Sequence, residues 1–200
     1  MTVTRTAQLT RKTGETDISL SLGLSGTGAG SRKTGVGFFD HMLDLVARHG
    51  RLDLEVTAAG DLHTGSHHTV EDTGLVLGQA LDVALGDRRG IHRYGHAVVP
   101  MDEARAACAI DLSGRPYALI SGFERLPGGE VGGFEYEVAE EFFRSVASAA
   151  RLTLHIDLQA GTNAHHMIEA CFKAFARALR IAVAIDPDEP GVPSTKGTLT

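Results

Sequence analysis

An internal repeat restricts this chain to folds that can be assembled from two similar halves. The hexapeptide at 51–56 (Arg-Leu-Asp-Leu-Glu-Val) returns at 151–156 as Arg-Leu-Thr-Leu-His-Ile, 100 residues later. The stretch 15–26 aligns with 103–114 at an offset of 88 residues. Because the related segments follow one another in the same order, the chain is predicted to be a duplication.

The two copies are expected to join at residues 86–90, Gly-Asp-Arg-Arg-Gly, because this stretch is charged and bounded by glycines. We therefore predict a first half-domain over residues 1–88 and a second over residues 89–200. Each half alone is too small to bury a large core, so the halves are expected to pack against each other.

Each half is predicted to run strand, helix, strand, helix. In the first half, apolar residues alternate over 18–24 and 52–56, which indicates half-buried strands. Apolar residues recur at helical spacing over 38–46 and 70–85. The second half repeats this pattern. The predicted fold class is α+β, with two duplicated half-domains, each a small antiparallel or mixed β-sheet covered by two helices.

The composition is that of an ordinary globular chain, with 200 residues, 42% hydrophobic and 22% charged. The net charge of −6 argues against a nucleic-acid partner. No apolar run approaches the roughly 20 residues of a membrane span. Cys108 and Cys171 cannot form a disulfide framework, so we expect core residues of a cytoplasmic protein. The glycine-rich stretch 26–30 lacks dinucleotide-binding spacing and is predicted to be a turn.

The repeat contains two copies of His-His-x-x-Glu, at 67–71 and 165–169. At the start of a helix, neighbouring histidines point about 100° apart around the axis, so one helix can offer ligands to two metal ions. Imidazole and carboxylate ligands favour Mn, Fe, Co, Ni or Zn over Mg or Ca. A single copy would usually be a solvated polar patch. The duplication in register favours metal binding.

The repeat adds one ligand candidate to each half. His41 alone would be interpreted as an ordinary half-buried histidine beside two phenylalanines. The alignment places Glu141 opposite His41, and a carboxylate can replace imidazole as a ligand. The remaining histidines have no partner at metal-binding spacing and are expected to be ordinary: His49, His63, His92, His96 and His155.

A weaker signal concerns anion binding. Arginine and lysine beside hydroxyl groups commonly hold phosphate. Each such residue alone would be interpreted as an ordinary surface group. The candidates are Arg93, Arg115, Lys173, Ser194 and Lys196.

Together these motifs resemble the imidazoleglycerol-phosphate dehydratase family of histidine biosynthesis, in its monofunctional form. The resemblance covers nearly the whole chain and rests on these segments: 39–43 (FDHML), 67–72 (HHTVED), 100–103 (PMDE), 111–116 (DLSGRP), 165–174 (HHMIEACFKA) and 193–197 (PSTKG).

The resemblance implies a fold like that of ribosomal protein S5 domain 2, and a homo-oligomer of 24 subunits with sites between subunits. It also implies two Mn²⁺ per active site, with other divalent transition metals possible. The implied metal ligands are His41, His67, His68, Glu71, His165, His166 and Glu169. The eighth family ligand is a histidine, and this chain has Glu141, the candidate from the repeat, at that position. The implied substrate contacts are Arg93, Arg115, Lys173, Ser194 and Lys196 for the phosphate, with Glu103 as a further contact.

The implied reaction is the dehydration of D-erythro-imidazole-glycerol phosphate to imidazole-acetol phosphate. In our hypothesis, an imidazolate bridging two metal ions expels the C3 hydroxyl to give a diazafulvene, which then loses the C2 proton. Glu15 is the first candidate for the acid/base and Glu169 the second. Without the resemblance, Glu15 could equally be a surface carboxylate at the start of a strand.

Two other classes of protein remain open on the residues alone. Two clustered His/Glu sites are also typical of a dinuclear metallohydrolase, in which the metal activates water. A dehydratase assay compared with generic phosphoester hydrolysis separates these enzymes. A non-catalytic metal-binding or storage particle would take up metal without turnover and would not need Glu15 or Lys196.

Overall fold

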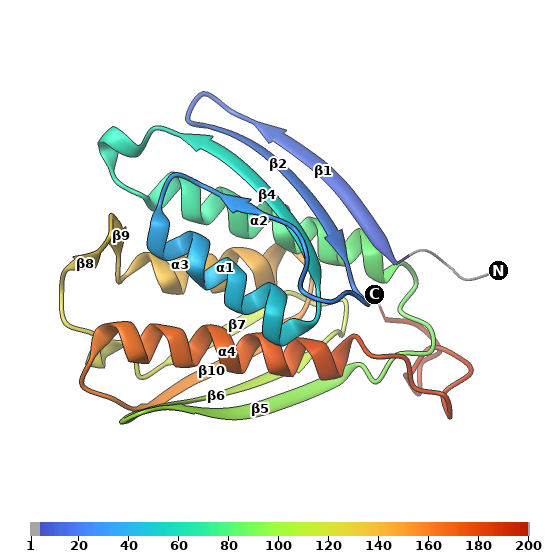
Figure 1. Ribbon diagram of the computed structural model, residues 1–200. Coiled ribbons are helices and arrows are strands. Elements are labelled where there is room, and N and C mark those ends of the chain that lie inside the picture. The colour runs from blue at the N-terminus through green and yellow to red at the C-terminus, as the bar shows by residue number, and fades with distance from the viewer. Residues whose placement is uncertain (1–4, 200) are drawn as a thin grey trace.

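In the computed structural model, which describes residues 5–199, four α-helices lie between two four-stranded β-sheets (Figure 1). The first sheet has the order β1-β2-β4-β3 and the second the order β5-β6-β10-β7. In each sheet, the first three strands in this order pair antiparallel and the last pairs parallel. This identical topology confirms the predicted α+β duplication.

The elements occur in the same order in both halves. The first half contains β1 (Thr6–Lys12), β2 (Thr16–Gly23), β3 (Arg32–Lys33), α1 (Gly37–Gly50), β4 (Asp53–Gly60), the 3-10 helix η1 (Leu62–Thr64) and α2 (His67–Leu85). The second half contains β5 (Tyr94–Met101), β6 (Ala104–Asp111), β7 (Tyr117–Ser121), η2 (Phe123–Arg125), β8 (Glu130–Val131), β9 (Phe134–Glu135), α3 (Val138–Ala149), β10 (Thr153–Ala160) and α4 (Ala164–Ala182).

The expected order of strand, helix, strand, helix omitted the edge strands β1 and β5. In β1 only Ala7 is buried, and in β5 only Gly95. An edge strand with a single buried residue lacks the regular apolar alternation that identifies a half-buried strand in sequence. The short strands β3 and β7 were also missed, and both pair parallel at the other edge of their sheets.

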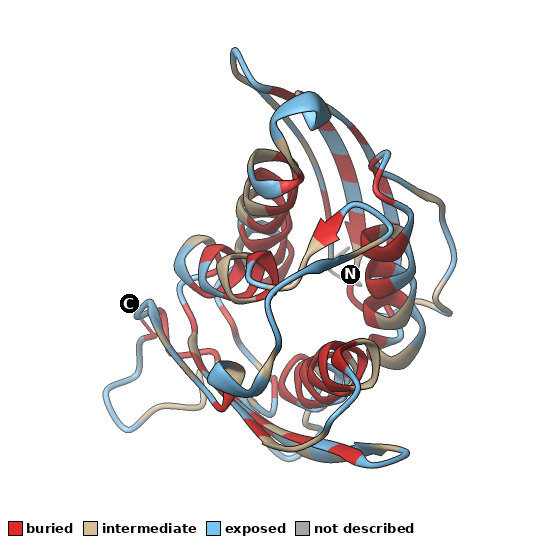
Figure 2. Ribbon diagram, turned by 90° about the vertical axis from the view of Figure 1, so that its left-hand side faces the viewer, coloured by how far each residue is buried: buried red, intermediate tan, exposed pale blue. Residues whose placement is uncertain are grey.

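The halves meet through their helices. Helix α2 packs on β1 and β2 and against α3, while α4 packs on β5 and β6 and against α1. The α2–α3 contact is especially close, because a Cβ atom at Gly74 would lie 2.9 Å from the carbonyl oxygen of Phe142. Figure 2 shows buried residues along the helices and at intervals along the strands of both sheets. A single core therefore spans both halves, as expected.

The joint between the halves is anchored in this core. Arg88 is 1% exposed, and its guanidinium donates hydrogen bonds to the carbonyl oxygens of Leu112, Ala150 and Arg151. It also pairs with Asp82 at 2.5 Å. The sequence of this stretch suggested an exposed, charged connection, but one of its charged residues, Arg88, is buried and links several elements.

Both cysteines are free and buried, as predicted. Burial raises the pKa of each thiol, so neither is a reactive thiolate at neutral pH. None of the helices described between residues 5 and 199 is long and apolar enough to cross a membrane.

Candidate metal centre

His41, His165 and Glu169 form a cluster between α1 and α4, hereafter the α1–α4 cluster. One donor atom from each lies within 4.8 Å of the other two. Nε2 of His165 lies 3.1 Å from Oε2 of Glu169, and Nε2 of His41 lies 3.8 Å from the same oxygen. Because α1 and α4 belong to different halves, the cluster forms only when the halves pack together.

The start of α4 is fixed by its cap. The side chain of Asn163 accepts a hydrogen bond from the backbone N–H of His166. The helix therefore begins at Ala164 and places His165 and Glu169 one turn apart on one face. The position of the motif at the start of a helix agrees with the prediction, as it does for α2, which begins at His67.

Glu169 uses its two oxygens differently. Oε1 lies 2.6 Å from Nζ of Lys173, and Oε2 faces the two histidines. Glu169 as a whole residue is 6% exposed. Burial opposes its ionisation, but the hydrogen bond and charge of Lys173, with a contribution from His41, hold the pKa of Glu169 below its usual value. One oxygen of an ionised carboxylate is therefore directed into the cluster.

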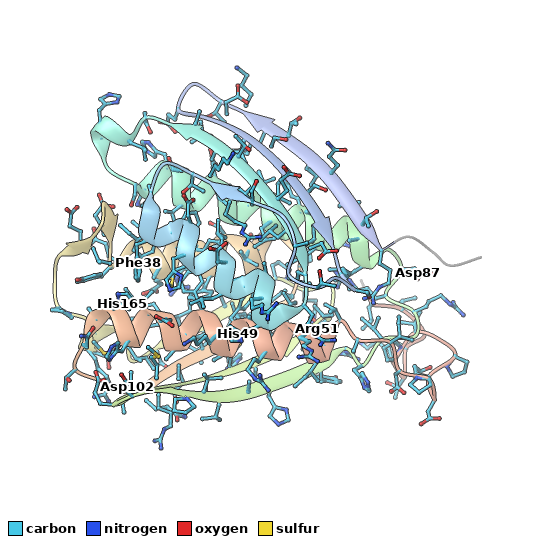
Figure 3. The ribbon with its side chains drawn as sticks, viewed as in Figure 1. Phe38, His49, Arg51, Asp87, Asp102 and His165 are labelled. Carbon is cyan, nitrogen blue, oxygen red and sulfur yellow. The ribbon has the colours of Figure 1, made fainter. Side chains whose placement is uncertain are left out.

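Aromatic rings pack against one side of the α1–α4 cluster. The ring of Phe38 lies edge-on to His165 at a centroid distance of 4.9 Å, and it also packs against Phe134. Figure 3 shows Phe38 and His165 facing each other near the start of α4, with Asp102 at the same end of the molecule. The apolar ring therefore packs on one side of an imidazole whose side chain is still 43% exposed.

The corresponding residues of the first half, His67 and Glu71 on α2, form a pair and not a cluster of three. Nε2 of His67 lies 3.4 Å from Oε2 of Glu71. Glu141, the counterpart of His41, lies half-buried in the first turn of α3. Within residues 5–199, the α1–α4 cluster is the one group of three such side chains with donor atoms within 4.8 Å, so Glu141 is not brought this close to His67 and Glu71.

The second histidine of each pair points elsewhere. His67 faces Glu71 and His165 faces Glu169, whereas His68 lies beside Asp61 and His166 beside Glu103. These different partners agree with the expected divergence of neighbouring side chains on a helix. Each helix therefore presents imidazoles in two directions.

His68 lies between two carboxylates. Its Nδ1 is 3.0 Å from Asp61, and its Nε2 is 3.8 Å from Oε1 of Glu15. The hydrogen bond to Asp61 is the main reason that the pKa of His68 is raised. Asp61 was not singled out in the sequence, and its position at the end of β4, just before the histidine pair, is the signal that could have identified it.

His166 has a corresponding partner in Glu103. Nδ1 of His166 lies 2.7 Å from Oε2 of Glu103, while Oε1 of Glu103 accepts backbone hydrogen bonds from Thr162 and Asn163. These contacts, that of His166 foremost, lower the pKa of Glu103 to about 2. A second carboxylate, Asp102, lies 3.8 Å from Nε2 of His166 and was also missed in the sequence.

Most predicted phosphate contacts lie far from the α1–α4 cluster. The guanidinium of Arg93 donates hydrogen bonds to Asp111 and to the carbonyl oxygen of Pro193. The second bond holds the C-terminal tail, which contains Ser194 and Lys196, close to Arg93. The backbone N–H of Arg93 donates to Ala182 at the end of α4. Since His165 is at the start of this helix, the separation is about 25 Å at 1.5 Å per residue. Lys173 alone reaches the cluster, and Arg115 is exposed in the turn after β6.

The donor set of the α1–α4 cluster fits a divalent transition metal. Two imidazole nitrogens and one carboxylate oxygen are ligands that Mn²⁺, Fe²⁺ and Zn²⁺ accept. Two atoms bound to one ion at about 2.1 Å lie at most about 4.2 Å apart. The separations of 3.1 and 3.8 Å meet this limit.

Comparisons with known proteins agree with the motifs. The family described as "Imidazoleglycerol-phosphate dehydratase" matches residues 34–179. Proteins of that name from Jannaschia sp. and Symbiobacterium thermophilum are 56% and 57% identical to the chain, each over 98% of it and over 100% and 93% of their own lengths.

Two solved structures are similar to the whole fold. The imidazoleglycerol-phosphate dehydratase of Staphylococcus aureus is 43% identical, with a TM-score of 0.81, over 90% of this chain and 99% of its own. The enzyme of Pyrococcus furiosus, solved in complex with (S)-C348, is 37% identical with a TM-score of 0.81, over 96% of this chain and 100% of its own.

Proposed function

This chain belongs to the imidazoleglycerol-phosphate dehydratase family, and we propose that it converts D-erythro-imidazole-glycerol phosphate to imidazole-acetol phosphate and water in L-histidine biosynthesis. The observation that carries the proposal is the convergence of His41, His165 and Glu169 from the two halves of the duplication. Because both of its cysteines are free and buried, we propose that this hydro-lyase acts in the cytoplasm.

We further propose that the reaction depends on two Mn²⁺ per active site, or on another divalent transition metal. One ion would be held by the α1–α4 cluster and the second by His67 and Glu71. Glu141, His68 and His166, which do not converge on these groups within one chain, would complete the ligand sets across subunit contacts. When bound, the metals would supply Lewis-acid stabilisation of negative charge on the imidazole ring.

The dehydration removes the C2 proton and the C3 hydroxyl, through the diazafulvene postulated above, so proton carriers are needed. Glu15 is the better candidate, because its side chain is 58% exposed and its Oε1 lies 3.8 Å from Nε2 of His68. Both oxygens of Glu169 are already directed at Lys173 and the histidines. We therefore assign Glu15 as the acid/base and Glu169 as a metal ligand.

The distance between the metal ligands and the tail supports an active site shared between subunits. Arg93, Ser194 and Lys196 lie near the end of α4, far from the cluster at its start. A phosphate held by these residues would reach the cluster of another copy more readily than that of its own chain. We propose a homo-oligomer of 24 subunits with its sites at subunit contacts.

The test is turnover by the purified protein, stripped of metal and then reloaded with Mn²⁺. We expect imidazole-acetol phosphate to form only after reloading, with no hydrolysis of p-nitrophenyl phosphate. Ester hydrolysis without dehydration would instead indicate a metallohydrolase. Metal uptake without turnover of either compound would indicate a storage particle.

A further inference from the structure

The turn between β1 and β2 holds the main chain of Glu15 while leaving its carboxylate free. The backbone N–H of Glu15 donates to Oγ1 of Thr13 at 3.1 Å, and its carbonyl oxygen accepts from the N–H of Asp61 at 3.1 Å. Thr13 also accepts from the N–H of Thr16 at 3.0 Å. The backbone around Glu15 therefore has a defined conformation at an otherwise exposed hairpin end.

A buried carboxylate ties this turn to α2. Asp72 is 8% exposed and accepts a hydrogen bond from Oγ1 of Thr16 at 2.5 Å and from Nε of Arg11 at 2.9 Å. Thr16 itself is 3% exposed. Since Asp72 follows His68 by four residues, both side chains lie on one face of α2. The same helix face thus presents His68 and holds the turn that carries Glu15.

The second half lacks this tie. The repeat aligns Thr16 with Ala104 and Asp72 with Ala170, so neither polar partner is present. The carboxylate aligned with Glu15 is Glu103, which is itself bound by two backbone N–H groups and His166. The buried pair of threonine and aspartate thus occurs in the half whose carboxylate is left free.

We infer that Asp72, acting through Thr16, is a positioning residue that keeps the carboxylate of Glu15 beside His68. The inference rests on the proposed role of Glu15 as acid/base. A displacement of about 1 Å in a reacting group can cost about 100-fold in rate. Loss of the buried hydrogen bond should therefore lower kcat, while substrate binding, which it does not contact, changes little.

The experiment compares three single variants of the Mn²⁺-loaded enzyme. Thr16→Val removes the hydroxyl at nearly constant volume, and Thr16→Ser keeps it. Thr73→Val is the matched control, because Thr73 is buried on α2 next to Asp72 and its hydroxyl has no hydrogen-bond partner within residues 5–199. We expect Thr16→Val to lower kcat by about 10-fold to 100-fold with KM and metal content nearly unchanged. Thr16→Ser and Thr73→Val should keep kcat near that of the parent.

A double variant separates positioning from a general structural role. If Thr16 acts through Glu15, Thr16→Val should have little further effect on kcat in a Glu15→Gln background. An equal loss in both backgrounds, or full kcat in Thr16→Val, overturns the inference. Asp72→Asn keeps the side-chain volume and should also lower kcat in the parent but have little further effect in the Glu15→Gln background. It replaces Thr16→Val in the test if that variant does not fold.

The variants distinguish the acid/base role of Glu15 from the positioning role of Asp72 and Thr16. If Glu15→Gln retains full turnover, the proposed acid/base role is wrong and the inference falls with it. If Glu15→Gln is impaired but Thr16→Val and Asp72→Asn are not, the acid/base role stands and the inference alone is wrong.

Discussion

Nζ of Lys173 lies 2.6 Å from Oε1 of Glu169, one helical turn away on α4. Both side chains are largely buried, with 18% and 8% of their surfaces exposed. The lysine compensates a buried carboxylate whose other oxygen faces His41 and His165. In the first half the aligned position on α2 is Leu75, so Glu71 has no lysine at the position that corresponds to Lys173.

Replacing Lys173 with methionine should destabilise the metal-free protein. The buried carboxylate of Glu169 would lose its partner, at a cost of about 1–3 kcal/mol. Mn²⁺ should then raise the Tm of the variant more than that of the parent, because the ion supplies the missing positive charge. Thermal melting with and without Mn²⁺ measures both effects. Lys12→Met is the control, since Lys12 is 76% exposed, and equal Mn²⁺ shifts in Lys173→Met and the parent would contradict the prediction.

Arg88 should contribute far more to stability than its neighbour Arg89. Arg88→Met leaves three carbonyl oxygens without their buried donor, while Asp82 keeps its contact with Arg151, and we expect a loss of about 3–5 kcal/mol. Arg89 is exposed, so Arg89→Met is the adjacent control. Urea denaturation of the metal-free protein compares the two. Similar midpoints for both variants would show that the buried guanidinium is not an anchor.

The duplication could be predicted because both copies keep their apolar alternation and their His-His-x-x-Glu motifs. The edge strands β1 and β5 could not, because each has a single buried residue. The ligand pairing of His41 with His165 depends on α1 of one half packing on α4 of the other. The partnership of His68 with Asp61 likewise depends on how the end of β4 returns to α2. Such contacts are set by packing and have no periodic pattern in the sequence.

Asp53 should stabilise the protein in a pH-dependent way. Its carboxylate accepts backbone hydrogen bonds from Thr27 and Ala29, and these lower its pKa below the ordinary value of 3.8. A lowered pKa gives stability that is present above the ordinary pKa and is lost as the pH falls through the lower, folded-state value. Asp53→Asn should therefore have a lower Tm than the parent at pH 7.

The difference in Tm between Asp53→Asn and the parent should shrink as the pH falls below 3.8. Glu55→Gln, which alters an exposed carboxylate on the same strand, is the control. Melting curves from pH 7 to pH 3 provide the measurement. A difference that stays constant over this range would show that the effect does not come from the charge of Asp53.

Two inactive variants should restore activity when mixed, if the active site is shared between subunits. Glu169→Gln damages the metal cluster, and Lys196→Ala removes a proposed phosphate contact of the tail. After dissociation and joint reassembly in equal amounts, about a quarter of the sites should pair an intact cluster with an intact tail. Turnover of the mixture measures this. Activity no higher than that of the separate variants would place both groups of residues in one chain's site.

We propose that His41, His165 and Glu169 hold a transition metal between the two halves. This binding can be measured by anomalous diffraction from Mn²⁺-loaded crystals, collected on both sides of the manganese absorption edge. We expect an anomalous peak within bonding distance of Nε2 of both histidines and Oε2 of Glu169. A map of the loaded protein without a peak at these three atoms would contradict it.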